Sequence, residues 1–139
     1  DGFDPEAGAE AWVMSTPPTL AIAPIKASLD LFDEIGMQAL RTKSVKLTGF
    51  LEFLINDVHN PKIEIITPAN IEERGGQLSI QVKNVDQKLF EALIARNVIL
   101  DWREPNVIRV APTPMYNSFE DVYRFVAVLK ECLELRQEL

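Results

Sequence analysis

Cysteine and histidine are nearly absent from this 139-residue chain, which carries one of each, Cys132 and His59. A single cysteine cannot form an internal disulfide, and one cysteine with one histidine cannot complete a Cys/His zinc site. Long apolar runs are also lacking, since no stretch approaches the roughly 18 residues of a membrane span. These absences argue against a disulfide-stapled, zinc-dependent or membrane-spanning domain, and a lone cysteine suits a reducing compartment.

Positive charge is in deficit, because 14 Lys and Arg face 21 Asp and Glu, which gives a net charge of −7 at pH 7. Such a field repels polyanions, so we expect no nucleic-acid partner. The amino end, residues 1–6, is acidic and has neither the basic segment of a signal peptide nor an initiator methionine. We therefore expect a cytoplasmic protein that does not act at a membrane, and a chain that begins in mid-protein.

The remaining composition is ordinary for a globular protein, with 47% hydrophobic and 25% charged residues. The length predicts a single domain. The order of expected elements, ααββαββα, predicts an α+β fold in which helices pack on a small, mostly antiparallel sheet of about four strands. After a loop at 1–18, we expect helices over 20–35 and 37–58, strands over 62–67 and 77–83, a helix over 86–95, strands over 98–102 and 107–111, and a helix from 118 to the carboxyl end.

Residue periodicity also predicts which side chains face a core. Ser118 and Asp121 have the spacing of a capping box at the start of the last helix. Strand alternation places Leu78, Ile80 and Val82 on one face. Helical spacing gives four apolar stripes: Ala21, Ile25, Leu29, Phe32 and Ile35; Leu40, Val45 or Leu47, Phe50, Leu51, Leu54 and Ile55; Leu89, Leu93 and Ile94; and Val122, Phe125, Val126, Leu129 and Leu133.

Arg109 is the most unusual residue of the chain, because it interrupts an apolar β-forming segment, residues 107–111, that a proline closes. A guanidinium among apolar neighbours on a short strand favours a carboxylate or phosphate partner, which it can bind through two parallel hydrogen bonds. The alternative is an arginine on an edge strand whose side chain extends to water. The pattern alone leaves both interpretations open.

Ser15 and Thr16 place two hydroxyls on a loop stiffened by two prolines, just ahead of the first expected helix. Hydroxyls and free amides at such a point can bind a phosphate. Taken by themselves, however, these residues favour an ordinary helix cap, because serine and threonine commonly supply one.

Other reactive or charged side chains favour structural roles. His59 follows a helix end beside Asp57, which favours a solvated terminus over general-base chemistry. Cys132 lies between two leucines of the last helix, where a free cysteine behaves as a small hydrophobic residue. The bases of the second helix, Arg41, Lys43 and Lys46, are expected on a solvated face.

Nine stretches in register resemble the C-terminal domain of kynureninases. They are residues 14–18 (MSTPP), 27–32 (ASLDLF), 40–44 (LRTKS), 47–52 (LTGFLE), 65–68 (IITP), 73–78 (ERGGQL), 103–106 (REPN), 108–112 (IRVAP) and 114–119 (PMYNSF). Any one tetrapeptide is weak, but together the stretches cover essentially the whole chain.

The resemblance implies a fold-type-I pyridoxal-phosphate hydrolase that works as a homodimer. Such enzymes cleave L-kynurenine or 3-hydroxykynurenine to anthranilate or 3-hydroxyanthranilate and L-alanine, in tryptophan catabolism by the kynurenine pathway and in NAD biosynthesis. The family's cofactor lysine lies in a large domain, and no lysine of this chain matches its motif. The resemblance thus implies that residues 1–139 form the single C-terminal small domain, without the large cofactor-lysine domain, and that the fragment has no activity of its own.

Two positions acquire roles through the resemblance. Arg109 matches the arginine that pairs with the substrate α-carboxylate in the family. Thr16 matches the position where the family carries Thr or Asn near pyridoxal 5'-phosphate, contributed across the dimer interface. Because relatives with Asn there use it in accepting the 3-hydroxyl group, Thr16 leaves the choice between kynurenine and 3-hydroxykynurenine open. No catalytic residue and no metal ligand is expected within these 139 residues.

Two other functions fit parts of the sequence. The small domain of another fold-type-I enzyme, a cysteine desulfurase or a class V aminotransferase, would also carry an arginine for the carboxylate. A stand-alone regulatory module that binds an amino acid would explain why the chain shows no constellation for autonomous chemistry.

Overall fold

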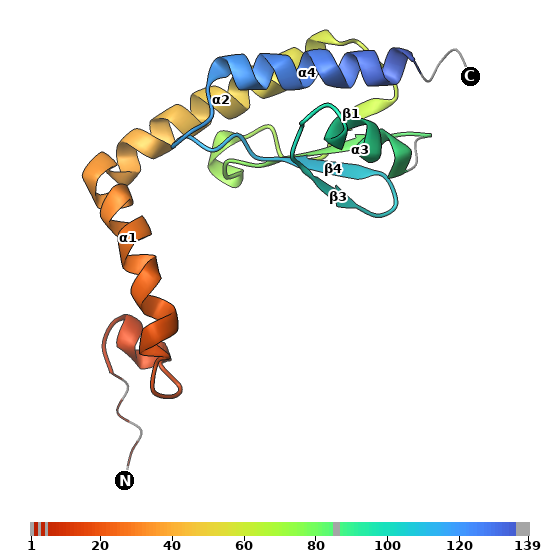
Figure 1. Ribbon diagram of the computed structural model, residues 1–139. Helices are drawn as coiled ribbons and strands as arrows, with labels where there is room; N and C mark the ends of the chain where they lie inside the picture. The colour runs from red at the N-terminus through yellow and green to blue at the C-terminus, as the bar shows by residue number, and fades with distance from the viewer. Residues whose placement is uncertain (1, 3, 5, 85–86, 136–139) are drawn as a thin grey trace. The chain divides into compact units, whose positions relative to one another are not determined.

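The computed structural model describes residues 2, 4, 6–84 and 87–135 (Figure 1). It divides into two compact units, an N-terminal unit, Asp1–Met37, and a C-terminal unit, Gln38–Leu139. The N-terminal unit contains a short 3₁₀ helix, η1 (Ala9–Trp12), and one long helix, α1 (Thr19–Ile35).

Helix α1 begins directly after a double proline. Pro18 is its N-cap residue, and Gly36 ends it with a φ of 83°, a left-handed conformation that glycine adopts without strain. The sequence predicts that the helix either kinks or begins at Pro24; the start there is wrong, because the helix begins at Thr19 and includes Pro24. As the sixth residue of the helix, Pro24 removes one backbone hydrogen bond, which an amide at this position would donate to the Leu20 carbonyl.

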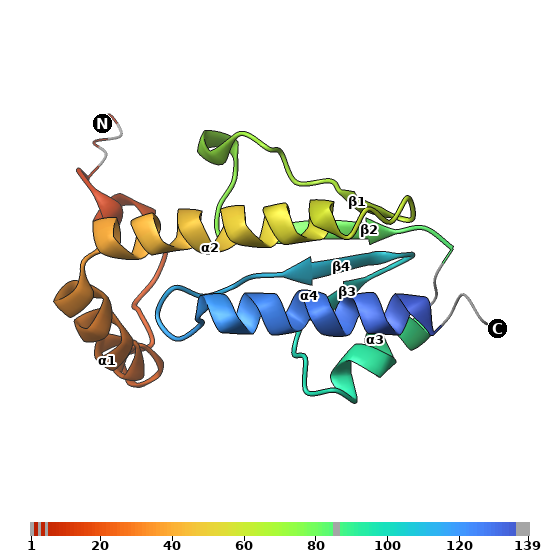
Figure 2. The ribbon, with the colours of Figure 1, turned by 90° about the horizontal axis from the view of Figure 1, so that it is seen from above.

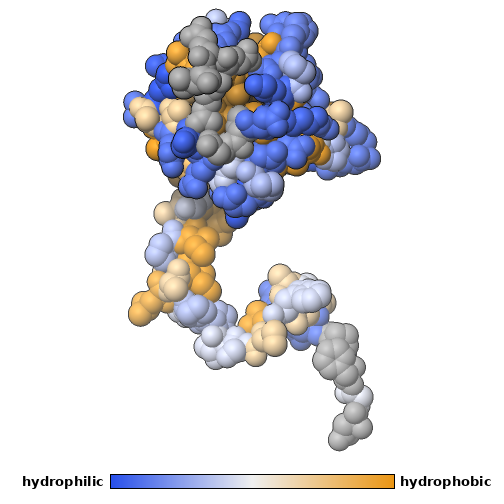
Figure 3. Space-filling model, turned by 90° about the vertical axis from the view of Figure 1, so that its right-hand side faces the viewer, coloured by the Kyte–Doolittle hydropathy of each residue, from blue (hydrophilic) through white to orange (hydrophobic). Residues whose placement is uncertain are grey.

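The N-terminal unit exposes its apolar side chains. None of its described residues is buried, and the stripe expected along α1 is open to solvent, from 37% exposure at Phe32 to 55% at Leu29. Figure 3 shows hydrophobic side chains gathered on the surface of this unit. Its exposed large apolar residues are Trp12, Val13, Met14, Leu20, Ile22, Ile25, Leu29, Leu31, Phe32 and Ile35. An exposed apolar surface of this kind marks an interaction site.

The C-terminal unit is a helix-covered antiparallel sheet. Its strands pair in the order β1-β2-β4-β3, and every pairing is antiparallel. The elements are α2 (Met37–Asp57, with Met37 in the first unit), β1 (Ile63–Ile65), η2 (Ile71–Glu73), β2 (Leu78–Val82), α3 (Gln87–Ile94), β3 (Asp101–Arg103), β4 (Val107–Val110) and α4 (Phe119–Glu134). The predicted α+β fold and its element order are confirmed.

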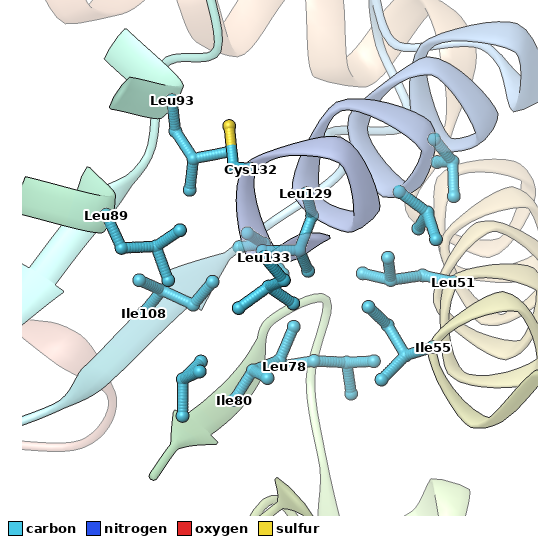
Figure 4. Packing of buried hydrophobic residues seen from close by; sticks show 14 of the residues in the cluster. Leu51, Ile55, Leu78, Ile80, Leu89, Leu93, Ile108, Leu129, Cys132 and Leu133 are labelled. Carbon is cyan, nitrogen blue, oxygen red and sulfur yellow. The ribbon is translucent and has the colours of Figure 1, made fainter. Parts of the chain in front are cut away.

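A single hydrophobic core fills the space between the sheet and its helices. Helices α2 and α4 lie side by side over one face of the sheet (Figures 1 and 2). Alternation along β2 directs Leu78, Ile80 and Val82 into this core, as predicted, and Ile108 of β4 joins them. Figure 4 shows Leu78 beside Ile55 of α2, and Ile108 beside Leu89 of α3. Val110, Ile63, Ile65 and Trp102 also pack on this core, and the alternate strand positions between them face the opposite, uncovered side.

The helices contribute most of the predicted stripes to this core. Leu47, and not Val45, is the buried member of α2 between Leu40 and Leu51, so the second alternative is confirmed. Leu89 and Leu93 of α3 are buried, but Ile94 is 42% exposed, so its predicted burial is wrong. The predicted helix start at Asp86 and the carboxyl end of the last helix lie outside the described residues.

Strand β3 is shorter and begins later than the sequence predicts. It starts at Asp101 in place of Val98, and Ile99 is 95% exposed. In this register Asp101 pairs with Arg109, so the predicted start at Val98 would lie opposite Pro112. Proline has no amide hydrogen to extend the ladder.

Two basic residues of α2 bind backbone carbonyls, which corrects the expectation of a solvated face. Arg41 donates from Nη2 to the Ile71 carbonyl at 2.7 Å, and Lys43 donates from Nζ to the Pro114 carbonyl at 2.7 Å. Only Lys46 of the three is exposed.

The segment 68–76 is fastened to α2 by a buried ion pair. Arg74 lies 2.6 Å from Glu52, between Nη2 and Oε2, and its side chain is only 3% exposed. Its Nη1 also donates to the Pro68 carbonyl at 3.2 Å. At Gly76, a Cβ would lie 3.0 Å from the Ser44 hydroxyl, so a larger residue there would require the Ser44 side chain to shift.

The capping box of α4 is formed as predicted. The Asp121 amide donates to Ser118 Oγ at 3.2 Å, and the Ser118 amide donates to Asp121 Oδ2 at 2.8 Å. The hydrogen bond from the Ser118 backbone is the main cause that lowers the pKa of the Asp121 carboxyl below 3.8.

Replacing a fully buried core side chain tests the packing. Leu129→Ala should lower the free energy of unfolding by about 2–5 kcal/mol, because Leu129 is 0% exposed and truncation leaves a cavity. Urea unfolding of the chain measures this change. Ile99→Ala, at the exposed position, should change it by less than about 0.5 kcal/mol. Equal effects of the two substitutions would contradict the described core.

Acid titration tests the capping box. Because folding lowers the pKa of Asp121, its stabilising contribution is complete above pH 3.8 and is lost as the pH falls through the lower folded value. The difference in urea midpoint between the parent and Asp121→Asn should therefore be largest at about pH 5 and shrink toward about pH 2. Glu120→Gln, which removes a charge from the same turn but no capping-box partner, should show a smaller difference. A difference independent of pH would refute this role.

Candidate functional site

The candidate site lies on the uncovered face of the sheet, on β4, the strand next to the edge strand β3. Strand β4 pairs with β2 on one side and with β3 on the other, so it is an inner strand. Its Ile108 and Val110 are buried in the core, and alternation therefore directs Arg109 to the opposite face. The interpretation of Arg109 as an edge-strand arginine does not fit this topology.

Arg109 is paired with a carboxylate of its own chain. Its Nε donates to Asp101 Oδ2 at 2.6 Å, and its Nη2 donates to the same oxygen. The two residues are directly opposite in the register of β3 and β4, and Ser79 of β2 is opposite Arg109 on the other side. The Arg109 side chain is 33% exposed, so part of it is open to solvent.

A second guanidinium contacts the same carboxylate. Arg103 donates from Nε to Asp101 Oδ2 at 3.0 Å. The hydrogen bond from Arg109 is the first cause that lowers the pKa of the Asp101 carboxyl below 3.8, and the charge and hydrogen bond of Arg103 act in the same direction. Asp101 is therefore ionised at neutral pH, and the three side chains together carry a net charge of +1.

The pairing leaves part of the Arg109 guanidinium available. Nε and Nη2 form one edge of the group, which Asp101 occupies, while Nη1 and Nη2 form a second edge that can bind a carboxylate through two hydrogen bonds. Within the described part of the chain, Nη1 of Arg109 has no hydrogen-bond partner. The arrangement can bind a further anion on a face that the core does not use.

Thr16 lies in the N-terminal unit, in the loop that precedes α1, and it is exposed. The cap of α1 is Pro18, which makes no side-chain cap hydrogen bond, so the expected capping role of Ser15 and Thr16 is wrong. Among the described residues, the Thr16 hydroxyl has no hydrogen-bond partner. Thr16 and Arg109 belong to different units.

The other singled-out residues take the structural roles that their patterns favour. His59 is exposed at the end of α2, with a φ of 50°. Cys132 is 2% exposed within the core, where its sulfur accepts a hydrogen bond from Arg96 Nη1 at 2.9 Å. In the described ranges, His, Cys, Asp and Glu side chains form no group of three or more that could hold a metal ion.

Sequence reasoning missed Asp101, although a signal for it exists. Residues 104–106 form the predicted turn between β3 and β4, and Arg103 pairs with Val107 across it. Two residues away from the turn on each strand, Asp101 of β3 therefore lies opposite Arg109 of β4. The expectation of a strand over 98–102 did not include this count, and so the partner of the candidate arginine was overlooked.

Over the residues that the structure covers, none of the helices combines the length and hydrophobicity that crossing a bilayer requires.

Comparison with solved structures places this arrangement in a known fold. A NifS-like protein superposes with a TM-score of 0.71 at 19% identity, over 95% of this chain and 38% of that chain. An alanine–glyoxylate aminotransferase from Nostoc sp. superposes with a TM-score of 0.64 at 19% identity, over 91% of this chain and 34% of that chain. At this identity the likeness concerns the fold alone.

Comparison of sequences gives the family. A kynureninase of Christiangramia forsetii is 49% identical over 132 residues, which are 93% of this chain and 31% of that protein. A kynureninase of Xanthomonas oryzae pv. oryzae is 52% identical over 127 residues, 89% of this chain and 30% of that protein. The chain thus spans about three tenths of the length of these relatives. The family described as "Kynureninase C-terminal domain" matches residues 40–129, and the chain belongs to this family.

Proposed function

We propose that these 139 residues are the C-terminal small domain of a kynureninase. The whole enzyme would hydrolyse L-kynurenine or 3-hydroxykynurenine to anthranilate or 3-hydroxyanthranilate and L-alanine. The observation that carries the proposal is Arg109, which lies within the matched residues 40–129 and keeps a free guanidinium edge on the uncovered face of the sheet. A hydrolase of this kind needs a cationic group that fixes the α-carboxylate of an amino acid.

A large domain that carries the cofactor lysine would be supplied by a part of the protein outside these residues. The relatives, about three times as long as this chain, support this division. So does the exposed apolar surface of the N-terminal unit, which a further domain or a second subunit of a homodimer would cover. We place the enzyme in the cytoplasm, where the buried thiol of Cys132 would stay reduced.

Arg109 would orient the substrate. A bidentate grip on the α-carboxylate fixes two points of the amino acid, which determines the bond at the α-carbon that faces the reacting group. Because β4 is an inner strand with buried neighbours on either side, the arginine is held on a rigid element. The side-chain ketone of the substrate is then held in one place for attack by water.

The residues present fit pyridoxal 5'-phosphate to the extent that this chain would contact it. Thr16 has an exposed hydroxyl that caps no helix, so it is available to donate a hydrogen bond to an oxygen of the cofactor. When bound, the cofactor supplies an electron sink for the α-carbon of the substrate. The 139 residues alone would be inactive, because the lysine that holds the cofactor in the family lies elsewhere.

Truncating Arg109 tests the substrate-binding role. In the full-length enzyme, Arg109→Ala should lower kcat/KM for kynurenine at least about tenfold, equivalent to about 1.4 kcal/mol, because the carboxylate loses its partner. Release of fluorescent anthranilate measures the rate. Arg109→Lys should also lower kcat/KM, since an ammonium group lacks the planar fork.

The same assay contains the controls. The 139-residue chain, supplied with cofactor and kynurenine, should release no anthranilate. An unchanged kcat/KM in Arg109→Ala would defeat the assignment of Arg109. A full-length protein that forms alanine without anthranilate would defeat the assignment of the reaction and favour another enzyme of this fold.

Removing the Thr16 hydroxyl tests the cofactor contact. Thr16→Val keeps the shape of the side chain, so the Kd of the full-length protein for pyridoxal phosphate should rise about fivefold through loss of one hydrogen bond. Absorbance of the bound cofactor measures the Kd. Ser15→Ala removes the neighbouring hydroxyl as a matched control. If the two variants bind the cofactor equally well, Thr16 has no special role.

A further inference from the structure

The guanidinium of Arg109 is held along one edge only. Its Nε and Nη2 both donate to Oδ2 of Asp101, and the edge formed by Nη1 and Nη2 points away from that oxygen. An arginine side chain that is free of such a partner samples many rotamers, and ordering them costs binding free energy. A fixed partner on one edge therefore prepares the other edge for a ligand.

The backbone fixes where this partner lies. Asp101 and Arg109 are directly opposite each other in the antiparallel pair of β3 and β4, so their side chains leave the sheet on the same face. The aspartate side chain is short and has little freedom of its own. A three-residue turn, 104–106, joins the two strands and keeps their register.

The charges explain why a carboxylate beside Arg109 does not cancel its use as an anion site. Arg103 binds the same oxygen of Asp101 from 3.0 Å, so one negative charge is shared by two guanidiniums. Asp101, Arg103 and Arg109 together keep a net charge of +1. Within the described part of the chain, both N–H donors on Nη1 of Arg109 remain available for a ligand.

We propose that Asp101 is a positioning residue, which holds the Nε–Nη2 edge of Arg109 so that the Nη1–Nη2 edge receives the α-carboxylate of the substrate. This inference rests on the proposed function, in which Arg109 binds that carboxylate. The opposite possibility is that Asp101 competes with the substrate for the arginine and must be displaced.

Kinetics of Asp101→Asn in the full-length enzyme separate these possibilities. The substitution keeps the size of the side chain but removes its charge, which weakens the hold on Arg109. We expect KM for kynurenine to rise about tenfold with a smaller change in kcat. Affinity for the decarboxylated amine of kynurenine, measured as competitive inhibition, should change less than twofold, because this probe has no α-carboxylate.

Glu64→Gln is the matched control. Glu64 lies on the same uncovered face, on edge strand β1, and its partner is Lys83 at 3.0 Å. The substitution removes one negative charge from the face without touching Arg109, and KM should change less than twofold. An equal rise of KM in both variants would show that the effect does not depend on the contact with Arg109 and would overturn the proposal.

A measurement without turnover accompanies the kinetics. In NMR spectra of the 139-residue chain, the Nε–H of Arg109 should exchange slowly with water in the parent and in Glu64→Gln, and at least about tenfold faster in Asp101→Asn. Equal exchange in all three proteins would show that Asp101 does not hold the guanidinium.

Each remaining outcome decides the question. A lower KM in Asp101→Asn would show that Asp101 competes with the substrate, and an unchanged KM would show that it does nothing for binding. A loss of affinity for the amine equal to that for kynurenine would indicate general damage to the site. These three results overturn the inference alone, whereas a parent enzyme that releases no anthranilate overturns the proposed function and this inference with it.

Discussion

The alternation of side chains along β4 is the constraint on which the candidate site depends. Ile108 is fully buried under the helices, and this burial fixes the rotation of the strand about its own axis. Arg109, the next residue, must then leave the sheet on the uncovered face. A slip of one residue in register would bury the guanidinium without a partner, at a free-energy cost that the apolar core could not offset. The core thus determines where the cation lies.

Much of the fold was predictable from the sequence because its signals are local. The alternation of Leu78, Ile80 and Val82 and the capping box of Ser118 each depend on neighbours within a few residues. The errors arose where distant residues decide. The predicted start of β3 at Val98 falls opposite Pro112 of another segment, and Arg41 leaves the solvated face of α2 because a carbonyl of the segment 68–76 lies within reach.

The candidate site was predictable only in part. The apolar surroundings of Arg109 indicated an anion partner, but they could not say that one already belongs to the chain. Asp101 is eight residues away, and only the pairing of β3 with β4 brings the two together. The role of Thr16 came from family resemblance, since a hydroxyl on an exposed loop carries no chemical signal of its own. The position of Pro18 as the cap of α1 then left that hydroxyl unused.

The buried contact between Arg74 and Glu52 changes how the stretch between β1 and β2 should be treated in engineering. A glycine-containing connection between two strands normally accepts an inserted tag or fluorescent reporter. Here an insertion would separate Arg74 from Glu52 and leave a cation almost without solvent. Even next to Ile99, whose side chain is 95% exposed, only a substitution is safe, because its neighbours Val98 and Leu100 pack against the core and an insertion would displace them.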